Sequence, residues 1–231
     1  MKYLVFIIPI LIILLVILFK VKIKFKTFLK VGFLPKRNNF GLYCYCGSQG
    51  RGKTYSLIEY LYDNKDSIKV FSNIKNININ GLDVSYFDDF KEMNIIKDSI
   101  DNGDLVTDKQ IVFVYDELFE ELIKGSKIDK ETMDFLCQMR KRKIIFLTTC
   151  QYWNELPISF RRFCRYQIEC RTFNFLIVGI LWKRFRDGEN MKWDEQEQDF
   201  VAPLVENTIS KCRIKVANSY NTNERIRKKI D

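Results

Sequence analysis

The chain has 231 residues, with 38 lysines and arginines against 29 aspartates and glutamates, and a net charge of +9. Once the terminal segments are set aside, its length leaves about 190 residues, enough for one well-cored domain but not for two. The sequence contains no histidine, which excludes any mechanism that needs a histidine base.

An uncharged apolar run, Tyr3–Phe19, comes first, with Pro9 as its only interruption. A run of this length is about the shortest that crosses a bilayer core of about 30 Å, so we expect residues 1–20 to form a transmembrane anchor. A cleaved signal peptide is the alternative, but the run lacks a small-residue A-x-A end and passes directly into lysines. The sequence therefore favours a permanent anchor.

A basic stem over residues 21–38 is expected next. Positive charges without any acid flank the apolar run on this side: Lys20, Lys22, Lys24, Lys26, Lys30, Lys36 and Arg37. The positive-inside rule then predicts a single pass through the host cell membrane, with the C-terminal domain in the cytoplasm. Together with Lys2, these residues supply eight of the nine net charges, so the overall charge does not by itself predict nucleic-acid binding.

A glycine-rich motif lies between a strand pattern and a helix pattern. The apolar run Phe40–Cys46 is typical of a buried strand, and Tyr55–Tyr62 has helical apolar spacing. Between them the sequence fits G-x-x-x-x-G-K-[ST] over Gly47, Ser48, Gln49, Gly50, Arg51, Gly52, Lys53 and Thr54. In such a loop the backbone amides bind nucleotide phosphates, Lys53 reaches the β and γ phosphates, and the Thr54 hydroxyl binds Mg²⁺. A glycine-rich turn that matches by accident is the alternative.

A second apolar strand pattern, Ile111–Tyr115, leads into Asp116 and Glu117. The carboxyl ends of buried parallel strands open on the crevice where ligands bind. We therefore expect Asp116 to hold Mg²⁺ and Glu117 to orient and polarise the attacking water. This acidic pair favours ATP hydrolysis over simple nucleotide binding. Two acids that only start the next helix are the alternative.

A third strand is predicted at Lys143–Cys150, and Gln151 follows it directly. An amide at this end of a strand can contact the γ phosphate and the water, as a sensor of the nucleotide state. The other predicted elements are a strand at Lys69–Ile74, an amphipathic helix at Asp88–Ile100, a polar loop at residues 101–110, and a hairpin formed by Tyr166–Cys170 and Phe175–Trp182.

Seven cysteines, an odd number, are scattered through apolar stretches, which is typical of buried thiols in a reducing compartment. Cys44 and Cys46 alternate along one strand, so both side chains share one face. Because no histidine is present to complete a zinc set, the sequence does not favour a metal site of the Cys/His kind.

The order of these motifs resembles that of the filamentous-phage assembly ATPases, the zonula occludens toxin-like family within the FtsK/HerA group. The resemblance rests on the glycine-rich loop, Lys69–Ile74, Tyr115-Asp116-Glu117, Arg140–Gln151, Phe160-Arg161 and Tyr220-Asn221-Thr222-Asn223-Glu224. It implies an α/β fold of the P-loop NTPase class, RecA-like with a mainly parallel central sheet, over residues 39–231. Many members of the family place the membrane span after this domain, whereas here it comes first.

The resemblance also implies a function. It is that of a membrane-anchored ATPase, with ATP and Mg²⁺ as cofactors, that drives extrusion of single-stranded DNA while phage coat proteins are added at the membrane. Gln151 would be the sensor. Arg161 would be an arginine finger donated to a neighbouring subunit, with Arg162 as the fallback, which requires a homo-oligomer such as a ring.

Two other functions stay open. The first is a double-stranded DNA translocase or packaging ATPase of the same group, with the same active site. It should bind duplex DNA with a salt dependence set by phosphate contacts. The second is a membrane adaptor that binds nucleotide only as a structural switch, and measurable hydrolysis would exclude it.

Overall fold

A computed structural model describes residues 21–22, 40–118, 122, 130–139, 141–175 and 178–221. The expected anchor over residues 1–20, most of the basic stem and the basic tail from residue 222 lie outside the described residues. Among the residues that are described, no helix is both long and apolar enough to cross a membrane.

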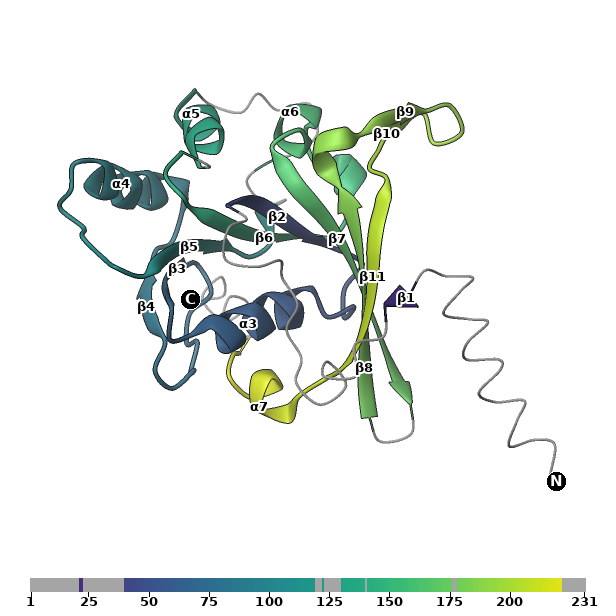
Figure 1. The fold of residues 1–231 in the computed structure, drawn as a ribbon, viewed down its shortest axis with the longest axis horizontal. Coiled ribbons are helices and arrows are strands. Elements are labelled where there is room, and N and C mark those ends of the chain that lie inside the picture. Colours follow the sequence, from purple (N-terminus) through teal and green to yellow (C-terminus); the bar gives the residue numbers. More distant parts are fainter. Residues whose placement is uncertain are drawn as a thin grey trace, which may run out of the picture.

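The described part of the chain is built around a nine-stranded sheet (Figure 1). Its strands are β1 (Val21–Lys22), β2 (Gly41–Cys46), β3 (Ile68–Ser72), β4 (Asp83–Tyr86), β5 (Gln110–Tyr115), β6 (Ile145–Cys150), β7 (Cys164–Phe175), β8 (Val178–Asp187) and β11 (Leu204–Lys211). Their spatial order is β1-β11-β8-β7-β2-β6-β5-β3-β4. All neighbouring pairs from β7 to β4 are parallel, which confirms the mainly parallel α/β sheet predicted from the sequence.

Helices cover both faces of this sheet (Figure 1). On one face lie α3 (Lys53–Asn64) and the short α7 (Ile214–Ala217). On the other face lie α4 (Phe90–Asp101), α5 (Lys130–Gln138) and α6 (Ile158–Arg161), and the short 3₁₀ turns η2 (Trp153–Glu155) and η3 (Gly188–Asn190) complete the described helical segments. Each face of the sheet therefore carries its own hydrophobic core.

The central strands alternate between these two cores. In β2, Leu42, Cys44 and Cys46 pack into the core on the α4 side, whereas Tyr43 and Tyr45 pack into the core on the α3 side. Because both faces are buried, the strand sequence is a continuous apolar run, as expected of a parallel strand covered by helices on both sides.

The N-terminus of α4 is capped by hydrogen bonds to the side chains of two acidic residues. The Asp89 carboxylate accepts a hydrogen bond from the Glu92 backbone N–H at 2.9 Å, and the Glu92 carboxylate accepts one from the Asp88 N–H at 2.7 Å. This reciprocal pair satisfies backbone donors at the free end of the helix. The helix predicted at Asp88–Ile100 is confirmed within two residues at its start and one at its end.

An antiparallel extension follows the parallel strands. β8 runs antiparallel to β7 and β11 runs antiparallel to β8, so the predicted hairpin is confirmed. Its strands are longer at both outer ends, and Phe175, assigned from the sequence to the second strand, is the last residue of the first. A small separate hairpin, β9 (Lys192–Asp194) with β10 (Asp199–Val201), lies beyond it. At the edge, Val21 and Lys22 pair in parallel with β11, so the first residues assigned to the stem belong to the sheet.

Candidate nucleotide-binding site

The glycine-rich loop joins the carboxyl end of β2 to the first turn of α3. Gly47, Gly50 and Gly52 have φ angles of 147°, 75° and 81°, a region that only glycine adopts without strain. Arg51 N donates to the Ser48 carbonyl at 3.3 Å, which closes the loop on itself. The loop therefore ends at the N-terminus of a helix, where backbone N–H groups are free to bind an anion.

The loop lies directly against β7. A Cβ atom at Gly47 would stand 2.8 Å from the Cys170 carbonyl oxygen, and one at Gly52 would stand 2.6 Å from the Thr172 methyl carbon. The Thr172 hydroxyl also donates to the Gly50 carbonyl at 3.0 Å. These two glycines are thus required by space as well as by φ, because any side chain would push the loop away from the strand.

The loop and the acidic strand end meet. The Thr54 hydroxyl, in the first turn of α3, donates to the Asp116 carboxylate, at 3.2 Å from Oδ1 and 3.3 Å from Oδ2. Residues 62 positions apart in the sequence are thus brought into contact at the carboxyl edge of the sheet. A hydroxyl and a carboxylate are the oxygen ligands that Mg²⁺ prefers, so the two residues fit a magnesium ion bound beside the loop.

Asp116 is held in place by Thr149 and Asn73, at the ends of the two neighbouring strands. No role for either residue was predicted from the sequence. The Thr149 hydroxyl of β6 donates to Asp116 Oδ1 at 2.6 Å. Asn73, just after β3, accepts from Asp116 N at 2.7 Å and donates to its carbonyl at 3.1 Å. The available signal was a polar residue at the end of each apolar strand, since those ends line one edge of a parallel sheet.

Glu117 and Gln151 lie at the ends of adjacent strands. Glu117 has φ 57°, a left-handed conformation that is uncommon for a residue with a side chain, and its N–H donates to the Thr149 hydroxyl at 2.8 Å. Its side chain is exposed, as is that of Gln151. A strained residue next to a candidate metal ligand is typical of functional sites, since the surrounding structure must hold it there.

A cavity of about 560 Å³ opens beside the loop, on its β7 side. Its lining includes Gly47, Ser48, Arg51 and Gln151, together with Cys46 at the end of β2. The lining does not include Thr54 or Asp116, so the cavity adjoins the candidate magnesium site and does not contain it. Of the site residues predicted from the sequence, Gly47, Ser48, Arg51 and Gln151 therefore line one cavity.

The C-terminal segment reaches the same region. Ser219 accepts from Asn78 N at 2.8 Å, which brings the segment to the loop after β3. Burial, together with the nearby Asp116 carboxylate, raises the pKa of Tyr220 to about 12. Tyr220 thus lies near the acidic strand end, whereas Thr222, Asn223 and Glu224 of the same motif lie outside the described residues.

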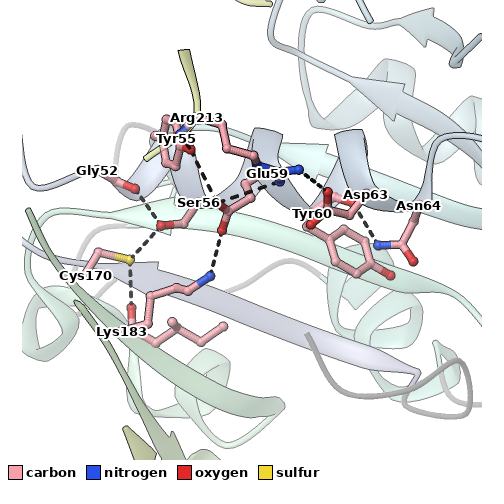
Figure 2. A network of polar contacts seen from close by, with 11 residues as sticks. Gly52, Tyr55, Ser56, Glu59, Tyr60, Asp63, Asn64, Cys170, Lys183 and Arg213 are labelled. Atoms are coloured by element: carbon pink, nitrogen blue, oxygen red, sulfur yellow. Dashed lines mark hydrogen bonds and ion pairs between the residues drawn. The ribbon is translucent and has the colours of Figure 1, made fainter. Parts of the chain in front are cut away.

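A buried polar network attaches α3 to β8 behind the loop (Figure 2). Lys183 Nζ lies 2.9 Å from Glu59 Oε2, and the two side chains are 4% and 1% exposed. The Arg213 guanidinium lies 2.7 Å from Asp63 and 3.8 Å from Glu59, and the Tyr55 hydroxyl lies 3.4 Å from Glu59. The Glu59 carboxylate therefore has partners from three parts of the chain.

The same network extends to the loop itself (Figure 2). The Ser56 hydroxyl donates to the Gly52 carbonyl at 2.7 Å and lies 3.4 Å from the Cys170 sulfur. Lys53 and Thr54 are in the first turn of this helix. Fixing α3 from behind therefore also fixes the turn that carries these two side chains.

The structure does not favour Arg161 as an arginine finger. Its side chain is 2% exposed and forms a bidentate ion pair with Asp199 of β10, at 3.1 Å and 2.9 Å. An arginine finger donated in trans must reach a neighbouring subunit, whereas the Arg161 guanidinium is buried and paired within its own subunit. The adjacent Arg162 is exposed, with its guanidinium 5.8 Å from the centre of the Phe200 ring, so the finger prediction passes to Arg162.

These two arginines should behave differently when replaced. Arg161→Ala is expected to lower the free energy of unfolding by about 3 kcal/mol, and Asp199→Ala by a similar amount, because each leaves a buried or partly buried charge without its partner. Arg162→Ala should change stability by less than about 0.5 kcal/mol but lower the ATPase rate by at least about tenfold. Urea unfolding and steady-state ATPase assays measure the two effects. Unchanged stability in Arg161→Ala would mean that the ion pair with Asp199 does not hold this side chain in place, and Arg161 would again be the candidate for the arginine finger.

The fold is similar to that of a solved structure, the N-terminal domain of zonular occludens toxin (Zot) from Neisseria meningitidis. The TM-score is 0.51 at 18% sequence identity, over 79% of this chain and 100% of that one. The chain has a Zot-like P-loop fold. The genome packaging NTPase from Sulfolobus turreted icosahedral virus 2, in complex with ATP-gammaS, gives 0.45 at 12% identity, over 74% and 100% of the two chains. No protein-family model and no curated protein matches the sequence.

Proposed function

We propose that this protein is an ATPase that binds ATP with Mg²⁺ and hydrolyses it at the carboxyl edge of its sheet. The observation that carries the proposal is the contact between Thr54 and Asp116, because it joins the phosphate loop to the acidic strand end. The Zot-like fold supports it, since a phosphate-binding loop and an acidic strand end at neighbouring positions are the working parts of P-loop ATPases.

Each residue then has a defined task. Backbone N–H groups of the loop bind the phosphates, and Lys53, whose ammonium lies 3.3 Å from the Ser48 carbonyl, binds the β and γ phosphates. Thr54 and Asp116 would hold Mg²⁺, which neutralises charge on the phosphates when bound. Glu117 accepts a proton from the attacking water, and Gln151 orients the γ phosphate and this water.

The wider role that we propose is phage assembly. A membrane anchor at residues 1–20 would hold the ATPase at the cytoplasmic side of the host membrane, where hydrolysis drives extrusion of single-stranded DNA with coat or assembly proteins. Arg162 donated to a neighbouring subunit would require a homo-oligomer, for which we expect a ring. The likeness to the Zot N-terminal domain and the order of the sequence motifs support this role.

Lys53→Ala tests the nucleotide site. Removing the ammonium is expected to weaken ATP binding by about 10- to 100-fold, because a hydrogen bond to a charged group contributes about 1.5–3 kcal/mol. A fluorescent ATP analogue titrated into the full-length protein measures the affinity. Lys97→Ala is the control, since α4 lies on the other face of the sheet from α3 and Lys97 pairs there with the adjacent Asp98 at 2.9 Å. Equal affinity in Lys53→Ala and the parent protein would contradict the site.

A steady-state ATPase assay on the full-length protein, with and without added DNA, identifies the nucleic-acid partner. Stimulation of ATP hydrolysis by single-stranded DNA supports the assembly role, whereas stimulation by duplex with a steep salt dependence supports a packaging or double-strand translocase. Hydrolysis that neither DNA affects would remove the DNA motor from the proposal. Nucleotide binding without hydrolysis would favour the alternative function, a membrane adaptor that binds nucleotide as a structural switch.

A further inference from the structure

Three buried cysteines converge where two central strands reach the nucleotide site. Cys46 is the last residue of β2, Cys150 is the last residue of β6, and the parallel register places them opposite each other. Cys44 lies two residues before Cys46 on the same face of β2. The residues that follow these strand ends are Gly47 of the phosphate loop and the sensor Gln151.

The sulfur positions fit a metal ion. The Sγ atoms are 3.4 Å apart for Cys44 and Cys150, 3.7 Å for Cys44 and Cys46, and 3.3 Å for Cys46 and Cys150. With zinc–sulfur bonds of about 2.3 Å, tetrahedral coordination places sulfurs about 3.8 Å apart. Shifts of about 0.5 Å would therefore bring all three sulfurs to bonding distance of one ion.

The ligand set selects the kind of ion. Three thiols are the only metal-ligating side chains in this cluster, and soft sulfur ligands prefer ions such as Zn²⁺ over Mg²⁺. Cysteine binds such ions as the thiolate, so binding of the ion is coupled to release of the thiol protons.

An ion also has a way in. The three side chains are 0%, 4% and 1% exposed, but Cys46 lines the cavity beside the phosphate loop. The cluster therefore adjoins a hollow open to solvent, which a binding site needs if metal is to enter the folded chain.

We propose that Cys44, Cys46 and Cys150 bind one soft divalent cation of the zinc class. Three thiolates leave the fourth coordination position of such an ion to water or another small ligand. Because β2 carries the phosphate loop and Gln151 follows β6, the ion would link these two strand ends beside the loop. The site is separate from the magnesium site at Thr54 and Asp116, so it goes beyond the proposed ATPase activity.

Cd²⁺ is the probe, because its bonds to thiolates give a charge-transfer absorption in the ultraviolet. The full-length chain carrying Cys137→Ser, which removes the exposed thiol, is reduced, freed of metal with a chelator and titrated with Cd²⁺. We expect one bound ion per chain, displaced by Zn²⁺. Adding Cys150→Ser should lower the affinity by more than about 100-fold, since losing a ligand costs more than losing its hydrogen-bond partner.

Cys164→Ser is the matched control, because Cys164 is fully buried in the same core but is not part of the cluster. It should leave the stoichiometry and the absorption unchanged. If Cys150→Ser does not fold, the chain with all its cysteines still provides a test: Cd²⁺ should slow alkylation of Cys46 but not that of Cys137. Equal Cd²⁺ binding in Cys150→Ser, absence of the absorption, or a disulfide between Cys46 and Cys150 in the protein as isolated would overturn the proposal.

Discussion

Glu117→Gln is expected to lower kcat for ATP hydrolysis by about 10²- to 10⁴-fold while changing the affinity for ATP by less than about threefold. The amide keeps the size and the exposed position of the side chain at the end of β5, but it cannot accept a proton from water. Single-turnover hydrolysis and titration with an ATP analogue, both on the full-length protein, separate chemistry from binding.

Glu197→Gln is the control for this change. Glu197 is also exposed, but it lies in the turn between β9 and β10, away from the acidic strand end. The control should keep the parent rate. A parent-like kcat in Glu117→Gln would instead assign the base to another group. A large loss of ATP affinity would mean that the carboxylate of Glu117 supports nucleotide binding and not only the chemical step.

Lys183→Met is expected to lower the free energy of unfolding by about 3 kcal/mol, which corresponds to a fall in Tm of about 6–12 °C for a domain of this size. The substitution leaves the Glu59 carboxylate 1% exposed without its partner at 2.9 Å. The expected cost is at the lower end for a buried pair, because Arg213 stays near Glu59 at 3.8 Å. Urea and thermal unfolding measure the effect.

A double variant and a surface control make this result specific. In Glu59→Met with Lys183→Met, the buried charge is removed as well, so most of the lost stability should return. Lys211→Met, on the exposed end of the neighbouring β11, should change stability by less than about 0.5 kcal/mol. Equal losses in Lys183→Met and the double variant would show that packing of the lysine chain matters, and not the charge pair.

The central strands could be predicted because burial on both faces leaves a strong signal in the sequence. β2, β3, β5 and β6 are short apolar runs that end in glycine or polar residues, and each is found within two residues of its predicted bounds. The antiparallel extension gives a weaker signal, because Arg171 and Arg184 interrupt its apolar pattern. The edge strand β4 (Asp83–Tyr86) has almost no apolar pattern from which a strand could be predicted.

The site could be predicted in its parts but not in its contacts. The motif spacing identified Thr54 and Asp116, and the structure places them in contact. The buried state of Arg161 depends on Asp199, which is 38 residues away, so no local pattern could reveal it. The proximity of Cys150 to Cys46 could not be predicted either, because it depends on which strand lies beside β2. The anchor, the ring and the DNA partner stay predictions.

The seating of the phosphate loop on β7 has a mechanical consequence. The Cys170 carbonyl and the Thr172 side chain that press on Gly47 and Gly52 belong to a twelve-residue strand, which leads into the antiparallel hairpin with β8. Close-packed contacts transmit displacement with little compliance. A displacement of that hairpin would therefore be transmitted to the backbone amides of the phosphate loop through the contacts at Gly47 and Gly52.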